Sequence, residues 1–131
     1  MWSVAYNSSG QLQTWYNKNL ATPTLIQDGT SYAGGSAIAV KGNDVYIAGT
    51  GNLQNSQSLV SKYWKNGSAV ILGSEGSAAL SLDVSGNDIY IGGFQQVAGG
   101  GSEAVYWKNG NAQQITNGTG SGMIRQILVK K

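Results

Sequence analysis

An internal repeat of about 44 residues constrains this chain more than any other feature of its sequence. The segment NDVYIAG at residues 43–49 returns as NDIYIGG at residues 87–93, so that Tyr46 and Tyr90 lie 44 positions apart. Another 44 positions before Tyr46 stands Trp2, in a degenerate copy of the same segment. A repeat of this length indicates one supersecondary unit used several times, with neighbouring units packed against each other.

Two further markers support the repeat. The segment YWKNG occurs at residues 63–67 and again at 106–110, and its first copy is the WY pair at residues 15–16, where the alignment is ambiguous by one residue. A third marker is apolar and occurs at residues 38–40, 82–84 and 127–129. We therefore divide the single domain into three units, which are residues 1–37 plus the C-terminal strand 123–131, residues 38–81, and residues 82–122.

Each unit contains runs in which Val, Ile and Tyr alternate with small or polar residues, which is typical of β-strands. Clusters of Gly, Asn, Asp and Ser separate the runs, and the Asn-Gly pairs after Lys65 and Lys108 are strong hairpin signals. No segment has the apolar spacing of an amphipathic helix. We expect an all-β chain with four short strands per unit, which in the third unit are Ala79–Val84, Asp88–Phe94, Glu103–Trp107 and Ala112–Thr116.

Four antiparallel strands repeated every 40–50 residues are typical of a β-propeller, in which each four-stranded unit is one blade. The markers also resemble those of bacterial β-propeller repeat proteins, largely uncharacterised, that carry NDVYVAG followed by YWKNG. The resemblance covers residues 38–131 well and residues 1–37 loosely. It implies three propeller blades in this chain and no particular activity.

The repeat pattern also predicts self-association. Met1-Trp2 aligns with the second strand of a blade, whereas residues 127–129 align with a first strand. Because an unpaired inner strand leaves its backbone groups unsatisfied, we expect Met123–Val129 to pair beside Met1–Tyr6 of another copy. Three blades are too few for a ring, so we expect a six-bladed homodimer. A nine-bladed trimer and a piece of a longer propeller, natural or engineered, are the alternatives. The residues expected at the junction are Met1, Trp2, Val4, Ile124, Ile127 and Val129.

The composition excludes several classes of chemistry. The 131 residues include no Cys and no His, which excludes thiol catalysis, cysteine zinc sites and the usual general base. A net charge of +2, with 11% charged residues, does not indicate nucleic acid or an anionic membrane as a partner. No apolar run approaches the roughly 18 residues of a membrane span, and no signal segment is recognisable. We expect no metal, no cofactor and no enzymatic activity, and the cellular compartment stays open.

Few carboxylates are available for acid–base chemistry. Asp44 and Asp88 stand in the repeated turn, where we expect them to bond their own backbone. Asp83 aligns with a first strand, where it either faces the central axis or serves as a solvated or hydrogen-bonded strand residue. Glu75 and Glu103 are expected on one rim and are the only pair to consider for a glycosidase. Their spacing adds no support to a hydrolase hypothesis.

The loops that follow the second and fourth strands of each unit are long, polar and variable, and such loops favour binding. Their Asn, Gln, Ser and Gly residues suit a neutral glycan better than a phosphate. Trp64 and Trp107 are expected between blades, with sugar stacking as the alternative. The candidate ligand-binding residues are Trp64, Trp107, Asn55, Gln57, Gln95, Gln96 and Glu103. We thus expect a non-enzymatic, self-assembling propeller that acts as a structural or binding scaffold, and a lectin-like glycan-binding module is the alternative.

Overall fold

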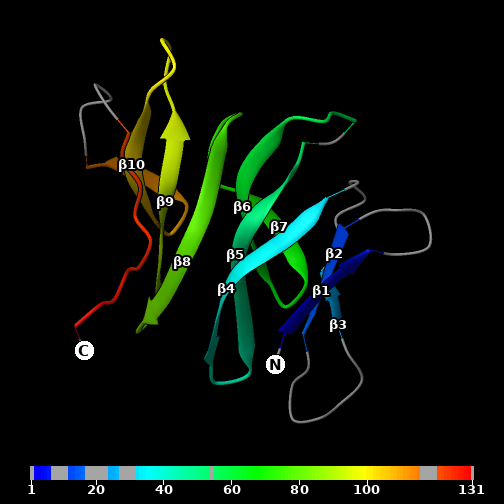
Figure 1. Cartoon of the computed structure of the whole chain (residues 1–131). Coiled ribbons are helices and arrows are strands. Elements are labelled where there is room, and N and C mark those ends of the chain that lie inside the picture. Colours follow the sequence, from blue (N-terminus) through cyan, green and yellow to red (C-terminus); the bar gives the residue numbers. More distant parts are fainter. Residues whose placement is uncertain are drawn as a thin grey trace.

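The computed structural model of the chain describes residues 2–6, 12–16, 24–26, 32–53, 55–115 and 121–130. Eleven β-strands in these residues form three antiparallel sheets, and none of the described residues is helical. The three sheets lie side by side in chain order (Figure 1). The all-β prediction is confirmed.

Within each sheet the strands follow one another in chain order, and each strand pairs with the next. The first sheet contains β1 (Trp2–Tyr6), β2 (Leu12–Tyr16) and β3 (Thr24–Ile26). The second sheet contains β4 (Ala33–Lys41), β5 (Asp44–Asn52), β6 (Leu59–Lys65) and β7 (Ser68–Ile71). The third sheet contains β8 (Ser77–Ser85), β9 (Asp88–Gln96), β10 (Ser102–Lys108) and β11 (Asn111–Gln114).

The second and third sheets are two copies of one arrangement. The four strands expected in the third unit are observed as β8 to β11, with ends shifted by one or two residues; Thr116 lies outside the described residues. The sheets begin at Ala33 and Ser77, five positions before the unit boundaries at 38 and 82. The difference arises because β4 and β8 extend beyond the apolar residues that mark them in the sequence.

A β-bulge explains the glycine that closes the first repeat marker. The bulge interrupts β4 and, at the equivalent place, β8. A Cβ on Gly49 would lie 1.9 Å from the carbonyl oxygen of Gly34, and a Cβ on Gly93 would lie 2.0 Å from that of Ala78. The two strands approach too closely there for any side chain, so both repeats require glycine.

The asparagine of the YWKNG marker joins two turns. Asn66 has a φ of 51°, in the left-handed region that hairpin turns use. Its Oδ1 accepts the Val45 N–H at 2.9 Å, and its Nδ2 donates to Asp44 Oδ1 at 2.9 Å. Asn109 makes both bonds again in the third sheet, at 2.8 Å each. The NDVY and YWKNG markers therefore belong to one structural unit.

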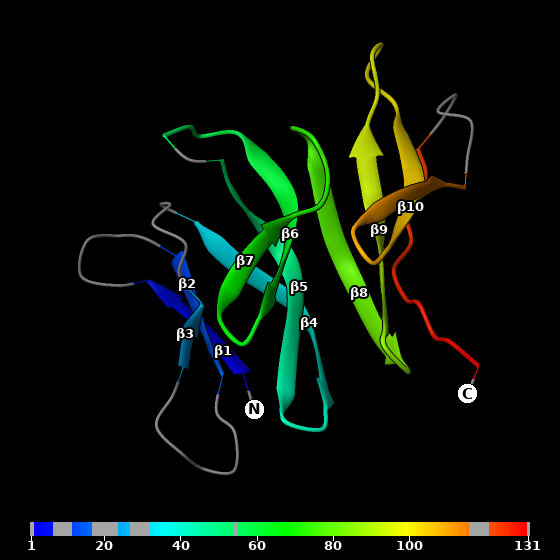
Figure 2. The ribbon, with the colours of Figure 1, turned by 180° about the vertical axis from the view of Figure 1, so that it is seen from behind.

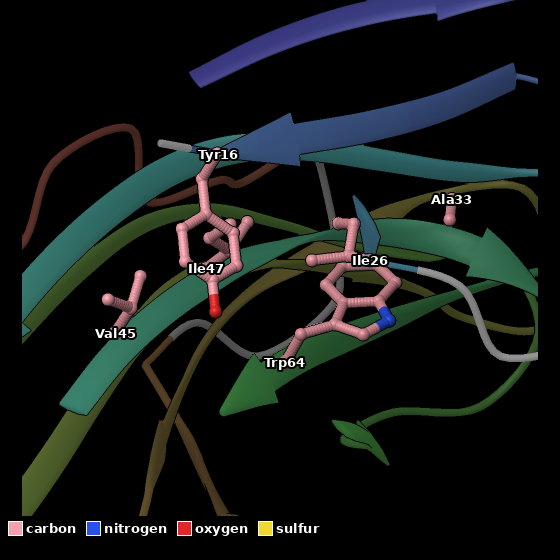
Figure 3. Packing of buried hydrophobic residues seen from close by; sticks show 6 residues of the cluster. All are labelled: Tyr16, Ile26, Ala33, Val45, Ile47 and Trp64. Atoms are coloured by element: carbon pink, nitrogen blue, oxygen red, sulfur yellow. The ribbon is translucent and has the colours of Figure 1, made fainter. Parts of the chain in front are cut away.

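Buried side chains fill the space between neighbouring sheets. Between the first and second sheets lie Tyr16, Ile26, Ala33, Val45, Ile47 and Trp64, and Figure 3 shows the Trp64 indole against Ile26. Between the second and third sheets lie Ala48, Ala79, Ile91, Val105 and Trp107. Trp64 and Trp107 are both 0% exposed, so each indole is a core residue of the junction with the preceding sheet.

We call residues 121–130 the C-terminal segment. It runs along the side of the third sheet that faces away from the second sheet (Figures 1 and 2). Apart from an isolated bridge between Ser121 and Ser102, it forms no strand. It ends at the same end of the molecule as the turns from β4 to β5 and from β8 to β9, and β1 begins at that end too (Figure 1).

Candidate functional site: an open strand edge and the C-terminal segment

One edge of β1 is open. The strand pairs with β2 over its whole length, from Trp2 opposite Tyr16 to Tyr6 opposite Leu12. The corresponding strands β5 and β9 have partners on both edges. Among the described residues, no strand pairs with the other edge of β1. Such an edge presents a row of backbone donors and acceptors to which a further strand can add.

The strand register aligns the first sheet with the other two. Trp15 lies opposite Ser3, as Trp64 lies opposite Ile47 and as Trp107 lies opposite the corresponding residue of β9. If Trp2 takes the position of Tyr46, as the repeat predicts, Trp15 is the counterpart of Trp64 and Trp107. The register agrees with this alignment of β1 with β5, which stays a prediction.

The C-terminal segment leaves the third sheet in the way in which β8 leaves the second. The Gly122 N–H donates to the carbonyl oxygen of Ser102 at 3.0 Å. Gly76, just before β8, donates in the same way to the carbonyl oxygen of Leu59 at 2.9 Å. Leu59 and Ser102 are counterparts, because each is the first residue of its strand. The start of the segment is thus equivalent to the start of β8.

Two further contacts hold the segment against the third sheet. The Ile124 N–H donates to the carbonyl oxygen of Gly93 at 3.0 Å, and the Val129 N–H donates to Asp83 Oδ2 at 2.7 Å. Asp83 is therefore a hydrogen-bonded strand residue that faces the segment. The residues that lie half-buried against the sheet are Gly122, Ile124, Ile127 and Val129.

Val40 in β4 is an exposed large apolar residue, and so are Leu128 and Met123 (45%) in the C-terminal segment. Val40 in β4 is 59% exposed, whereas its counterpart Val84 in β8 is 7% exposed because β8 lies beside β4 (Figure 1). Leu128 in the C-terminal segment is 76% exposed. Exposed large apolar side chains of this kind indicate surfaces that another chain can cover.

The residues expected at a junction between copies lie as follows. Met1 is outside the described residues, and Trp2 and Val4 lie in β1. Ile124 and Val129 are hydrogen-bonded to the third sheet of their own chain, and Ile127 is half-buried. In the described chain Met123–Val129 forms no strand with β1 of the same chain. Its pairing with β1 of another copy stays a prediction.

Trp64 and Trp107 need a correction as ligand-binding residues. Both indoles are fully buried between sheets, so neither presents a ring face on which a sugar could stack. Their Nε1 atoms find no hydrogen-bond partner in the part of the chain that the structure describes. The core interpretation of the YW pairs is the one that agrees with this burial.

The other candidate ligand-binding residues lie on two loops and their flanking strands. Asn55, Gln57 and Gln96 are exposed, and Asn55 has a φ of 58°. Gln95 and Glu103 lie opposite each other in β9 and β10 and are half-buried. Glu103 also accepts a hydrogen bond from the side-chain amide of Gln114. The exposed amides thus come from the loop after β5 and from the end of β9.

Three of the remaining carboxylates lie in described residues, and Asp28 lies outside them. Asp44 and Asp88 were expected to bond their own backbone, and this was wrong: each accepts instead from the side-chain amide of the Asn in the other marker. Each also lies within 4.0 Å of the Lys that precedes this Asn. Glu75 is exposed in the loop before β8. Within the described ranges, no three acidic, His or Cys side chains gather into a metal site.

Sequence reasoning missed two buried polar contacts, one within the second sheet and one between the second and third sheets. Lys62 in β6 is 3% exposed, and its ammonium group donates to the carbonyl oxygen of Asn52 at 2.5 Å. Ser61 and Ser77 join the second sheet to the third through hydroxyls that are 2.9 Å apart. The sequence offered one signal for Lys62, since its counterpart in the third unit is the apolar Val105.

No protein-family model matches this chain, and no curated protein matches it either. Among the described residues there is no helix long and apolar enough to cross a membrane. The open edge of β1 and the contacts of the C-terminal segment together make up the candidate site.

Proposed function

We propose that this chain is a non-enzymatic scaffold that self-associates into a closed β-propeller, with two copies forming a six-bladed ring. Each of the three sheets is one blade of this ring. Residues 123–129 of one copy add a fourth strand beside β1 of the other, and the twofold axis makes both copies donor and acceptor. Strand addition of this kind gains its affinity from main-chain hydrogen bonds.

One observation carries the proposal: the C-terminal segment starts against the third sheet as β8 starts against the second. Gly122 donates to Ser102 as Gly76 donates to Leu59. β8 continues as a strand paired with β9, whereas the segment meets no strand partner among the described residues beyond its isolated bridge. Among the described residues, β1 lacks the second strand partner that β5 and β9 have. The C-terminal segment of one copy and β1 of the other can therefore satisfy each other's backbone hydrogen bonds.

The second sheet gives the register of the proposed pairing. Ala39 in β4 lies opposite Tyr46 in β5. In the repeat, Leu128 aligns with Ala39, and Trp2 aligns with Tyr46. We therefore expect Leu128 of one copy opposite Trp2 of the other.

The same arrangement covers the exposed apolar side chains. Asp83, the counterpart of Leu128, faces Val129 of the strand that follows. By the same geometry, Leu128 of one copy faces Val40 of the other copy, because Val40 and Val129 occupy equivalent positions in the repeat. Fully burying a Val or Leu side chain stabilises by about 1.5–3 kcal/mol, so this pair contributes directly to the affinity of the two copies.

Light scattering behind a sizing column tests the proposal. We expect a mass of twice 13.7 kDa. Three times this mass would replace the dimer by the nine-bladed trimer, with the same strand addition. A monomer at every concentration would contradict the ring.

Deletion of residues 123–131 provides a second test. The shortened chain exposes a strand edge and both apolar surfaces at every junction, so we expect it to lose the assembled state. If the shortened chain kept the mass of the intact assembly, strand addition by these residues would be wrong.

Glycan binding stays the alternative function, and the exposed amides of Asn55, Gln57 and Gln96 favour it. A rigid ring would present two sets of these side chains on its rim. A glycan array measured with the assembled protein tests this function. Absence of binding at high micromolar protein would leave the scaffold function alone.

A further inference from the structure

We infer that the third sheet carries a strand-binding clamp, formed by Ser102, Gly92 and Asp83, which holds an extended apolar segment in one register. The chain's own C-terminal segment occupies this clamp. The clamp rests on contacts within one chain. We also infer that the clamp fixes the register in which the segment pairs with β1 of a second copy. This consequence rests on the proposed function.

Ser102 holds the start of the segment. Its carbonyl oxygen accepts the Gly122 N–H at 3.0 Å. Its Oγ donates to the Gly122 carbonyl oxygen at 3.2 Å and lies 3.2 Å from the Gly122 nitrogen, whose N–H it accepts. The N–H and the carbonyl oxygen of Gly122 are thus both hydrogen-bonded to Ser102.

Gly92 makes room for the first large side chain of the segment. A Cβ at this position would lie 2.4 Å from Ile124 Cγ2, which is closer than real contacts allow. The Ile124 N–H also donates to the carbonyl oxygen of the neighbouring Gly93 at 3.0 Å. A branched apolar residue therefore fits here against bare backbone.

Asp83 holds the other end of the segment. Its Oδ2 accepts the Val129 N–H at 2.7 Å, and its Oδ1 accepts the Val84 N–H at 2.9 Å. The second bond orients the carboxylate toward the segment. Hydrogen bonds to an ionised acceptor are about twice as strong as neutral ones, so Asp83 is the strongest polar contact of the clamp.

Equivalent positions in the second sheet have none of these groups. Leu59 stands where the third sheet has Ser102, Ala48 where it has Gly92, and Ala39 where it has Asp83. The second sheet has no need of a clamp, because its neighbour β8 is held by a ladder to β9. The C-terminal segment has no such ladder in the described chain. The side chains of Ser102 and Asp83, together with the carbonyl oxygens of Ser102 and Gly93, hold it instead.

Three fixed points along the segment define its register. A shift by one residue would move Ile124 away from Gly92 and the Val129 N–H away from Asp83, and it would turn each side chain to the opposite face. With the register fixed, the unpaired edge of the segment presents its backbone groups in one way only. The clamp therefore determines how the segment meets β1 of a second copy.

Amide hydrogen exchange of the full chain tests the clamp. We expect the Val129 amide to be protected in the wild-type chain and to exchange at least about tenfold faster in Asp83→Ala, which installs the residue of the second sheet. Glu75→Ala is the matched control, because it also removes one carboxylate but from an exposed position before β8, at the other end of that strand from Asp83; it should leave this amide unchanged. The dimer dissociation constant should rise in Asp83→Ala by a similar factor.

A double-mutant cycle tests the middle of the clamp. Gly92→Ala introduces the side chain that β5 carries at the same position. Because its Cβ would also lie 2.8 Å from Ser81 Oγ, the whole cycle is made in a Ser81→Ala background, since β4 carries Ala37 at that position. We expect it to increase exchange of the Ile124 amide at least about tenfold, and we expect Ile124→Ala to remove most of this added effect in the double variant. Fully additive effects would contradict the fit of Ile124 over Gly92.

The two proposals fail in different ways. A wild-type monomer whose Val129 amide is protected, and which loses this protection in Asp83→Ala, would overturn the ring and support the clamp. A dimer whose C-terminal segment exchanges at the rate of a free peptide would overturn the clamp. Equal exchange in Asp83→Ala and the wild-type chain would overturn it as well.

Discussion

Asp83 Oδ2 accepts the backbone N–H of Val129 at 2.7 Å, across 46 positions of the chain. The carboxylate is thereby committed to the backbone of the C-terminal segment. Its counterpart in the second sheet is Ala39, so the acidic group appears only where the neighbouring segment has no strand partner in the described chain. The sequence left the role of Asp83 open, and this hydrogen bond gives it a structural role.

Charge at the proposed contact between Val40 and Leu128 should prevent assembly. In Leu128→Asp a carboxylate would have to be buried against Val40 of the other copy, which is unfavourable without a partner. We expect the dissociation constant to rise at least about 100-fold, which corresponds to about 2.8 kcal/mol. The measurement is the mass by light scattering over a series of protein concentrations.

Ile71→Asp is the control for this variant. Ile71 is 54% exposed in β7, an outer strand that the proposed ring leaves in solvent. The substitution adds the same charge and should leave the mass unchanged. Combining Leu128→Asp with Val40→Lys should restore part of the affinity by pairing the two charges. Loss of assembly in Ile71→Asp alone would contradict the assigned interface.

Asn66 should contribute to stability in two separable ways. Asn66→Ala loses both side-chain hydrogen bonds and sets alanine at a φ of 51°, and we expect a loss of about 2–4 kcal/mol in the free energy of unfolding. Asn66→Gly keeps the backbone conformation and loses only the hydrogen bonds, so its loss should be about 1–2 kcal/mol. Urea unfolding measures both. Equal losses would show that the turn conformation contributes nothing.

The sequence predicts this fold well where a contact repeats. The strands β8 to β11 follow from alternation and turn residues, and the recurring Asn and Asp belong to one hydrogen-bonded unit. The sequence already indicated that these residues belong together, because Asp44 and Asn66 recur as Asp88 and Asn109. The prediction that each Asp bonds its own backbone was wrong. An Asp in a turn looks the same in the sequence whether its carboxylate bonds its own backbone or the side chain of a neighbouring turn.

Contacts that occur once are not readable from a repeat. Ser102, Asp83 and Lys62 each differ from the residue at the same position of the other unit. The sequence shows that these residues differ, but it does not show which residues they contact. Only the three-dimensional arrangement brings Ser102 and Asp83 to opposite ends of the C-terminal segment. The burial of Trp64 likewise depends on how two sheets pack, which strand alternation alone does not determine.

Gly49 should tolerate no side chain. In Gly49→Ala the new Cβ would lie 1.9 Å from the Gly34 carbonyl oxygen, so the backbone of the bulge has to move. We expect a destabilisation above about 3 kcal/mol, the upper end of the usual range for overpacking. Gly42→Ala is the control, since Gly42 has a φ of 59° and no atom within 4 Å of the added Cβ. Its loss should be only about 1–2 kcal/mol.

Thermal or urea unfolding distinguishes the two glycine variants. If Gly49→Ala and Gly42→Ala lost the same free energy, the close approach of the two strands would contribute nothing beyond backbone strain. The explanation of the glycine in the repeat marker would then be wrong.

Disulfide trapping should report the register between two copies. The chain contains no Cys, so introduced cysteines have no competing partners. Ile38 lies opposite Ile47 in the second sheet, and the repeat aligns Ile127 with Ile38 and Ser3 with Ile47. A variant that carries both Ser3→Cys and Ile127→Cys should therefore form a covalent dimer on oxidation, because directly opposed strand positions bring the sulfur atoms within bonding range. Non-reducing electrophoresis measures it.

The control for this experiment carries Ser3→Cys with Arg125→Cys, which differs only by a two-residue displacement along the segment. In the repeat, Arg125 aligns with Ser36, the unpaired residue of the bulge in β4, so this pair is not directly opposed and lies out of disulfide range. We expect little covalent dimer from it at equal protein concentration. Efficient linkage through Arg125→Cys, with none through Ile127→Cys, would contradict the register taken from β4 and β5. Equal linkage through both positions would mean that the segment slides along β1, which the three contacts to Ser102, Gly92 and Asp83 forbid.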